Sequence, residues 1–238
     1  MNPAISIKSL SRSFGSLRVL RNIDLEIQKG EFVTIFGPNG AGKTTLLKIM
    51  STLVTPTEGS VIIDGLDVKK EAVEIRKRIG VISHETYLYS DLSAEENLRF
   101  FGKMYGMDAG VLDERIDALL KQVGLLHRAG DRGGTFSRGM KQRLSIARAL
   151  IHEPSILFLD EPYTGLDQHA ADTFEQVLKG FDAQDSTKVM ISHNMERSLQ
   201  LCNRVLVMNK GQIVFDERRQ DIGDIEDFKQ TYSSLVQE

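Results

Sequence analysis

Hydrophobic and polar residues alternate in the first part of the chain, and continuous apolar runs follow later. From Ile23 to Ile27 every second residue is apolar, and the residues between and after are acidic or amide side chains. A period of two predicts a half-buried β-strand. The runs 156–159 and 205–208 are apolar throughout, which is typical of strands buried on both faces of a sheet. We therefore expect short β-strands in residues 4–36, and the later apolar runs predict strands of a sheet that is buried on both faces.

Strand and helix patterns alternate through most of the remaining chain, which predicts an α/β fold. The expected strands lie at 60–65, 79–82, 155–160, 188–191, 204–208 and 212–215, with helices at 71–78 and 223–238. From about 93 to 151 the pattern is helical only, and it opens on Ser93-Ala94-Glu95-Glu96, a capping box. We expect a single domain, with a β-rich core at about 1–92 and 152–238 and an inserted helical subdomain at about 93–151.

Composition narrows the choice of partners. The 238 residues include 30 Lys and Arg against 33 Asp and Glu, a net charge of −3, so nucleic acid is not an expected partner. The one cysteine, Cys202, permits no internal disulfide. No apolar run is long enough to span a bilayer and the start lacks a signal-peptide pattern, so we expect that the chain neither enters nor crosses a membrane.

A glycine-rich loop carries the strongest chemical signal. Residues 37–44 match the pattern G-x-x-x-x-G-K-[ST] and lie between an apolar run and a helix-forming run, the context that separates a phosphate-binding loop from a chance turn. Its backbone N–H groups and the following helix predict a site for the phosphates of ATP. The expected nucleotide-binding residues here are Gly37, Pro38, Asn39, Gly40, Ala41, Gly42, Lys43, Thr44 and Thr45. Lys43 would reach the β- and γ-phosphates, and Thr44 would hold Mg²⁺.

Two adjacent carboxylates end a later apolar strand. Asp160 and Glu161 follow the run 156–159, so they should lie at the carboxyl edge of the sheet, where α/β proteins bind ligands. We expect Asp160 to bind Mg²⁺ and Glu161 to act as general base toward the attacking water. Two solvated acids in a loop are the alternative.

The segment Phe136-Ser137-Arg138-Gly139-Met140 resembles the signature of ATP-binding cassette (ABC) ATPases, usually Leu-Ser-Gly-Gly-Gln. Ser137 and Gly139 match, and the other three residues depart. The resemblance covers essentially the whole chain: 162–167 is similar to the D-loop, and Ser192-His193 to the H-loop. It implies a P-loop NTPase fold with a mixed or parallel core sheet, an antiparallel β subdomain and an inserted helical subdomain.

The same resemblance assigns roles to further residues. His193 would contact the γ-phosphate as a catalytic residue beside Lys43 and Glu161. Phe14 stands where an aromatic residue stacks on adenine, although a core phenylalanine is the alternative. His84 occupies the place of the Q-loop glutamine, which joins Mg²⁺ to the membrane partner. Imidazole is a poorer ligand for a hard cation, so His84 is an expected but weaker nucleotide and metal contact.

The resemblance also implies how the protein works. Two identical chains would close head to tail around two ATP molecules, and each site would take Ser137 and Gly139 from the opposite chain. The dimer would drive separate integral membrane permease subunits from the cytoplasmic face of the membrane, as a peripheral subunit. The segment 85–105 is a candidate docking surface, and its aromatic residues are equally well explained as core of the helical subdomain.

Alternatives remain for function and cargo. One is a soluble ABC ATPase that acts on protein or nucleic acid, and another is a P-loop kinase or nucleotide sensor. The short chain resembles exporter-type cassettes more than sugar importers. Residues 84–101 are similar to the ATPase subunit of haem exporters in cytochrome c maturation, while drug, lipid or peptide export stays open.

Overall fold

The computed structural model describes residues 2–83, 85–182 and 186–236. Among these, six strands form one sheet, the core sheet, in the order β10-β9-β3-β8-β7-β6. Its strands are β3 (Phe32–Phe36), β6 (Ile79–Ile82), β7 (Ile156–Asp160), β8 (Thr187–Ile191), β9 (Arg204–Asn209) and β10 (Gln212–Arg218). All neighbours are parallel except β10, which pairs antiparallel with β9. Parallel pairing brings the carboxyl ends of β3, β7 and β8 to one edge.

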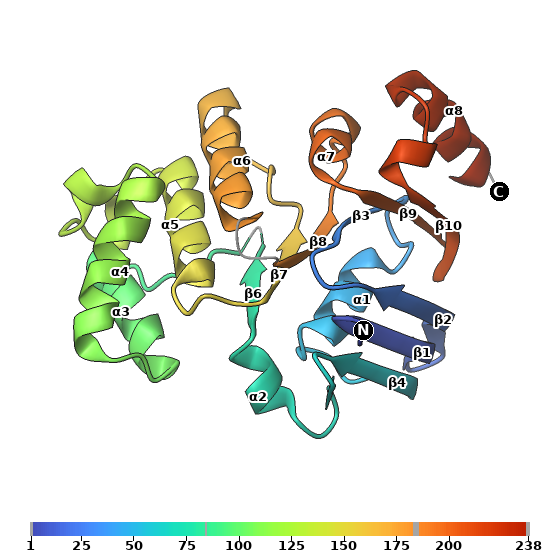
Figure 1. Ribbon diagram of the computed structural model, residues 1–238, viewed down its shortest axis with the longest axis horizontal. Helices are drawn as coiled ribbons and strands as arrows, with labels where there is room; N and C mark the ends of the chain where they lie inside the picture. The colour runs from blue at the N-terminus through green and yellow to red at the C-terminus, as the bar shows by residue number, and fades with distance from the viewer. Residues whose placement is uncertain (1, 84, 183–185, 237–238) are drawn as a thin grey trace.

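The core sheet is buried on both faces, as the continuous apolar runs predict. Every residue of β3, β7 and β8 is buried. Along β7, Leu157 and Leu159 pack into one hydrophobic cluster while Ile156 and Phe158 pack into the other. This alternation follows from the period of two in a strand. Helices α1 (Lys43–Met50), α6 (Gln168–Asp182), α7 (Met195–Leu201) and α8 (Ile225–Val236) flank the sheet (Figure 1).

A second, antiparallel sheet forms from the β-rich start. In the described part of the chain its strand order is β2-β1-β4-β5. The strands are β1 (Ile5–Phe14), β2 (Leu17–Ile27), β4 (Glu58–Ile63) and β5 (Leu66–Asp67). Ile23, Leu25 and Ile27 are buried whereas Asp24 and Glu26 are exposed, which confirms the predicted alternation. The expected α/β class with one mixed sheet and one antiparallel sheet is therefore confirmed.

The residues between β6 and β7 form a helical region on the far side of the core sheet from the antiparallel sheet (Figure 1). It contains α3 (Ala94–Met104), α4 (Ala109–Gln122) and α5 (Arg138–Leu150), and no described residue in it belongs to a strand. The predicted capping box begins α3: Glu96 N donates to Ser93 Oγ at 3.1 Å, and Ser93 N donates to Glu96 Oε2 at 2.7 Å. These reciprocal bonds satisfy two backbone donors that a helix start otherwise leaves unpaired.

Several element boundaries differ from those expected. The charged helix α2 spans only Ala72–Arg76. Helix α8 begins at Ile225, because Asp224 Oδ1 accepts hydrogen bonds from the backbone N–H groups of Glu226 and Asp227. Strand β10 runs on to Arg218. Among the described residues, no helix combines the length and the apolar character needed to cross a membrane.

Candidate functional site

The glycine-rich loop joins β3 to α1 and uses glycine where other residues would not fit. Gly37 has φ 151°, and a Cβ atom there would lie 2.2 Å from the carbonyl oxygen of Met208. Gly42 precedes α1 with φ 99°, and no side chain caps the helix. No side-chain cap occupies the first N–H groups of α1, which suits the loop to the predicted binding of an anion.

Lys43 turns back into this loop. Its Nζ atom donates to the carbonyl oxygens of Gly37 at 2.6 Å and Pro38 at 3.0 Å. Burial lowers the pKa of Lys43, and the carboxylates of Glu161 and Asp160 oppose that shift. The ammonium group is thus held inside the loop, at the place where phosphates would lie.

Asp160 and Glu161 end β7 at the same edge of the core sheet. Thr44 Oγ1 donates to Asp160 Oδ1 at 3.4 Å, so the loop and the acidic strand meet directly. Glu161 has φ +52°, in the left-handed region that is costly for residues other than glycine. Its amide donates to the carbonyl oxygen of Ile191 at 3.0 Å, which ties the turn to β8.

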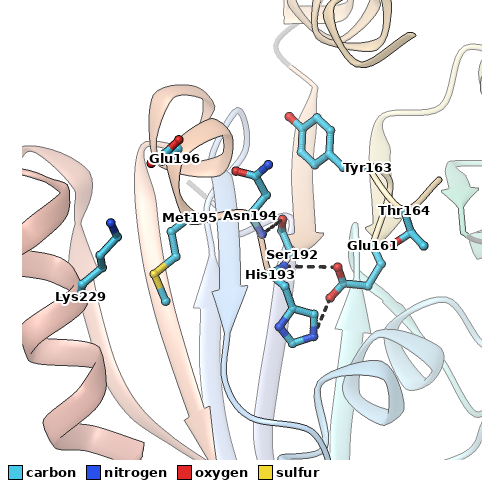
Figure 2. Close-up of a pocket in the computed structure, with 9 residues that line it drawn as sticks. All are labelled: Glu161, Tyr163, Thr164, Ser192, His193, Asn194, Met195, Glu196 and Lys229. Atoms are coloured by element: carbon cyan, nitrogen blue, oxygen red, sulfur yellow. Dashed lines mark hydrogen bonds and ion pairs between the residues drawn. The ribbon is translucent and has the colours of Figure 1, made fainter. Parts of the chain in front are cut away.

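His193 follows β8 and faces Glu161 (Figure 2). The backbone N–H of His193 donates to Glu161 Oε2 at 3.2 Å, and His193 Nε2 lies 3.3 Å from Oε1. Burial raises the pKa of Glu161; His193 and Lys43 oppose the rise, and Asp160 adds to it. The carboxylate is therefore half-buried beside an exposed imidazole, an arrangement suited to accepting a proton from a bound water.

These groups line one cleft of about 470 Å³. It contains Asn39, Gly40, Ala41, Gly42, Lys43, Thr44, Thr45, Asp160, Glu161 and His193 from the predicted set. Three further lining residues are apolar and were not predicted from the sequence: Leu17, Val19 and Ile191. Leu17 is exposed at the start of β2, and its apolar side chain after the Gly15-Ser16 turn was the available signal.

Phe14 does not line this cleft. Its side chain is 47% exposed, so the alternative of a buried core phenylalanine is wrong. The guanidinium carbon of Arg12 lies 4.3 Å from the centre of the ring. Phe14 pairs with Leu17 across the β1–β2 hairpin, which places it next to the cleft wall.

Ser137 and Gly139 lie at the N-terminus of α5, in the helical region, and do not line the cleft. Ser137 caps the helix by accepting from Met140 N at 3.3 Å, and the space around Gly139 is open. The guanidinium of Arg138 lies against Gly165, where a Cβ atom would come within 2.4 Å of Arg138 Nε. The signature-like segment therefore touches the loop after Glu161 in the same chain.

His84, the expected Q-loop contact, lies outside the described residues. The remaining metal candidates are Thr44 and Asp160, both oxygen donors of the kind that Mg²⁺ prefers. The described residues hold no cluster of three or more His, Cys, Asp or Glu side chains that would bind a metal by themselves. The donor set thus fits a cation that also takes oxygens from a bound nucleotide.

Known proteins are similar to this chain in sequence. A family model described as ABC transporter matches residues 20–164. The chain is 38% identical over 216 residues to the ABC transporter ATP-binding protein NatA of Bacillus subtilis, across 89% of this chain and 88% of that protein. It is 35% identical to the linearmycin resistance ATP-binding protein LnrL of the same species, across 88% of this chain and 68% of that protein. It is 36% identical to the Nod factor export ATP-binding protein I of Cupriavidus pinatubonensis, across 92% of this chain and 68% of that protein.

Solved structures share the fold. An ATP binding subunit of an ABC transporter superimposes with a TM-score of 0.90 at 26% identity, across 98% of this chain and 99% of that one. A dimeric ATP-binding cassette in a post-hydrolysis state, bound to ADP and Pi, superimposes with a TM-score of 0.82 at 30% identity, across 90% of this chain and 98% of that one.

Proposed function

The chain belongs to the ABC transporter family and is an ATPase of that family; from this premise we propose that it drives a separate membrane permease that exports its cargo. The cleft in which Lys43, Glu161 and His193 meet carries the part of the proposal that concerns ATP hydrolysis. Phosphoryl transfer depends on positioning and on charge stabilisation, and this cleft offers both from the chain's own residues.

We assign the roles from the geometry. Lys43 would exchange the carbonyl oxygens of Gly37 and Pro38 for β- and γ-phosphate oxygens when ATP enters. Thr44 and Asp160 would hold Mg²⁺, which neutralises charge on the phosphates. Glu161 would take the proton of the attacking water, and His193 would contact the γ-phosphate next to it.

We propose that a second copy of the chain completes the site. Ser137 is exposed and the space around Gly139 is open at a helix N-terminus, which suits an incoming phosphate, yet the two residues do not line the cleft of their own chain. A symmetric head-to-tail dimer would place them over the ATP of the partner. The dimeric cassettes among the similar structures support this arrangement.

The proposed permease contact is a groove of about 610 Å³ between β6, α3 and α5. Tyr87 and Tyr89 line it and are exposed, whereas Leu88 and Phe101 also line it and pack partly against the core. Core packing accounts for Leu88 and Phe101, and docking stays a proposal that rests on the exposed Tyr87 and Tyr89. We propose that an apolar helix of the permease fills this groove, because exposed aromatic side chains gather there and in a family of transport ATPases the permease is the partner to expect.

Export is supported by the names of the relatives, which give linearmycin resistance and Nod factor export. None of the relatives reported above is named for haem export. Haem stays one proposed cargo, on the resemblance of residues 84–101 alone. The proposed site of action is the cytoplasmic face of the cell membrane, where the permease would hold the subunit.

Affinity purification of the tagged chain from native membranes in mild detergent, followed by mass spectrometry, tests this function. We expect a stoichiometric polytopic membrane protein to co-purify with the chain, and the identity of that protein narrows the choice of cargo.

Leu53→Glu places a charge in the proposed groove. Val111→Glu is the matched control, because Leu53 and Val111 are 59% and 60% exposed and Val111 lies outside the groove. Only Leu53→Glu should lose the partner. Recovery of soluble partners alone would favour an ATPase that acts on protein or nucleic acid.

A further inference from the structure

Glu161 and His193 belong to two separate loops, and their contact depends on how those loops are held. Glu161 follows β7 and leads into α6, whereas His193 follows β8 and leads into α7. Beyond the two contacts between them, Glu161 Oε1 is buried and makes no hydrogen bond with any described residue. The position of the carboxylate is therefore set by the backbone on either side of it.

One turn after His193, Arg197 reaches from α7 across to α6. Its guanidinium forms ion pairs with Glu175 and, at 3.1 Å, with Asp172. The Arg197 side chain is 18% exposed and that of Glu175 is 16% exposed, so this pair is largely shielded from water. A partly buried arginine that binds two carboxylates is better ordered than a surface pair, and removal of one partner leaves a poorly solvated charge.

Tyr163 joins this ion-pair network to the loop that carries Glu161. It lies two residues after Glu161, and its hydroxyl donates to Glu175 Oε1 at 3.4 Å. Its ring packs edge-on against Phe174 at 5.5 Å, and the Arg197 guanidinium carbon lies 5.8 Å from the ring centre. Burial and the nearby Glu175 raise the pKa of Tyr163, so the phenol stays protonated and remains a donor. Figure 2 shows Tyr163 on the same loop as Glu161, which faces His193.

We propose that Arg197 is a positioning residue that, through Glu175 and Tyr163, holds Glu161 against His193 and so keeps the base aligned for ATP hydrolysis. The chain of contacts joins the two loops outside the nucleotide cleft, since Arg197 and Glu175 do not line it. The inference rests on the proposed role of Glu161 as general base. Misplacement of a reacting group by about 1 Å is enough to cost up to about a hundredfold in rate.

The test is steady-state ATP hydrolysis by the full chain with Arg197→Met, Arg197→Lys and Arg204→Met. Arg204 is the matched control because it also binds two carboxylates, Glu31 and Asp216, with a side chain that is 17% exposed. We expect Arg197→Met to lower kcat about tenfold to a hundredfold with KM for ATP changed less than about twofold. Arg197→Lys should recover part of kcat, and Arg204→Met should lower the unfolding temperature without this loss. Equal effects of the two methionine variants on kcat would overturn the proposal.

A double variant separates positioning from folding. If Arg197 acts through Glu161, adding Arg197→Met to Glu161→Gln should leave the residual rate of Glu161→Gln almost unchanged, because the base is already absent. A further tenfold loss would assign Arg197 another role and contradict the inference. Complete lack of hydrolysis by the unmodified chain would instead overturn the proposed function on which the inference rests.

Discussion

The nucleotide cleft and the N-terminus of α5 are both places where a loop leads into a helix, but their surroundings differ. In the cleft, Lys43 is buried and bonded to two carbonyl groups, and Thr44 reaches Asp160. At α5, Ser137 is exposed and Gly139 has no neighbour within 4 Å of a Cβ atom. The groups of the cleft contact one another within one chain, whereas the open space around Gly139 leaves room for another molecule at the N-terminus of α5.

On this difference rests the proposal that the two segments form one composite site when two chains associate. The cleft holds its loop, Lys43 and the acidic pair together within one chain, and only the bonds of Lys43 to Gly37 and Pro38 need to change when phosphates enter, so the binding of ATP should be a property of one chain. The exposed helix terminus is suited to bind an anion that another molecule brings to it. On the proposed dimer, hydrolysis should therefore depend on both segments and ATP binding on one.

The largest effect is expected from the acid in the cleft. Glu161→Gln removes the proposed base while keeping its shape, so hydrolysis should fall by about 10²–10⁴ and ATP should hold the chains together as a dimer. Light scattering with ATP and a phosphate-release assay measure both. Glu153→Gln is the matched control, because Glu153 is also a glutamate with positive φ, +53°, and lies outside the cleft. A monomeric, ATP-saturated Glu161→Gln would contradict the two-chain site.

The next largest effect is expected at the N-terminus of α5, and it distinguishes the role of that segment from the role of the nucleotide cleft. Ser137→Ala should lower hydrolysis about tenfold to a hundredfold and leave ATP affinity of the monomer unchanged, because Ser137 is outside its own cleft. Mixing it with Lys43→Ala should restore activity, since one site of the mixed dimer then has both intact segments. Ser93→Ala controls for loss of a helix cap, because Ser93 caps α3 in the same way. Failure of the mixture to regain activity would mean that the two segments act in the same chain.

The smallest expected effect is on the pH dependence of stability, and it arises where the helical region packs against the core sheet. His152, just after α5, bonds through Nε2 to the carbonyl oxygen of Ile79 at 3.0 Å and stacks on Tyr105 at 3.7 Å. Burial lowers the pKa of His152 to about 4; the bond to Ile79 opposes this shift, and Arg148 and Arg115 add to it. The unfolded chain therefore binds more protons between pH 4 and 6.5, and this contribution to stability is present above pH 6.5 and lost on acidification.

Chemical denaturation at pH 7 and pH 5 measures this effect. The unmodified chain should lose up to about 2 kcal/mol more of its free energy of unfolding than His152→Gln over that interval. The comparison uses the difference between the two pH values for each protein, so the lost stacking on Tyr105 cancels. Equal losses for the two proteins would show that His152 is protonated without cost in the folded state.

Local sequence was enough to predict the parts of the site that lie within one short segment. The loop 37–44, the acidic pair at the end of an apolar strand and the capping box at Ser93 each depend on neighbours within a few residues. Their geometry follows from glycine conformations, strand ends and helix starts, which are local properties. The same holds for the alternation at Ile23, Leu25 and Ile27, because one buried face imposes it.

Contacts between distant segments could not be predicted in this way. The sequence assigned Glu161 and His193 to one site only through a family resemblance, and the contact itself exists because β7 lies next to β8 in the core sheet. Leu17 and Val19 reach the cleft from the other sheet. Nothing local marks Arg197 or Glu175, since a charged residue on an amphipathic helix is ordinarily a solvated one.

By itself, the sequence determined the chemistry that this chain carries: a phosphate-binding loop, an acidic pair and a helix cap with a serine and a glycine. Each is a short-range pattern, and its residues are neighbours whatever the rest of the chain does. Only the tertiary structure decided which of these lie together. The parallel order of β3, β8 and β7 gathers the loop, the acids and His193 at one edge, while the insertion after β6 carries Ser137 and Gly139 away from it. The reason is that strand order is set by burial of the whole sheet, a long-range requirement that no single segment contains.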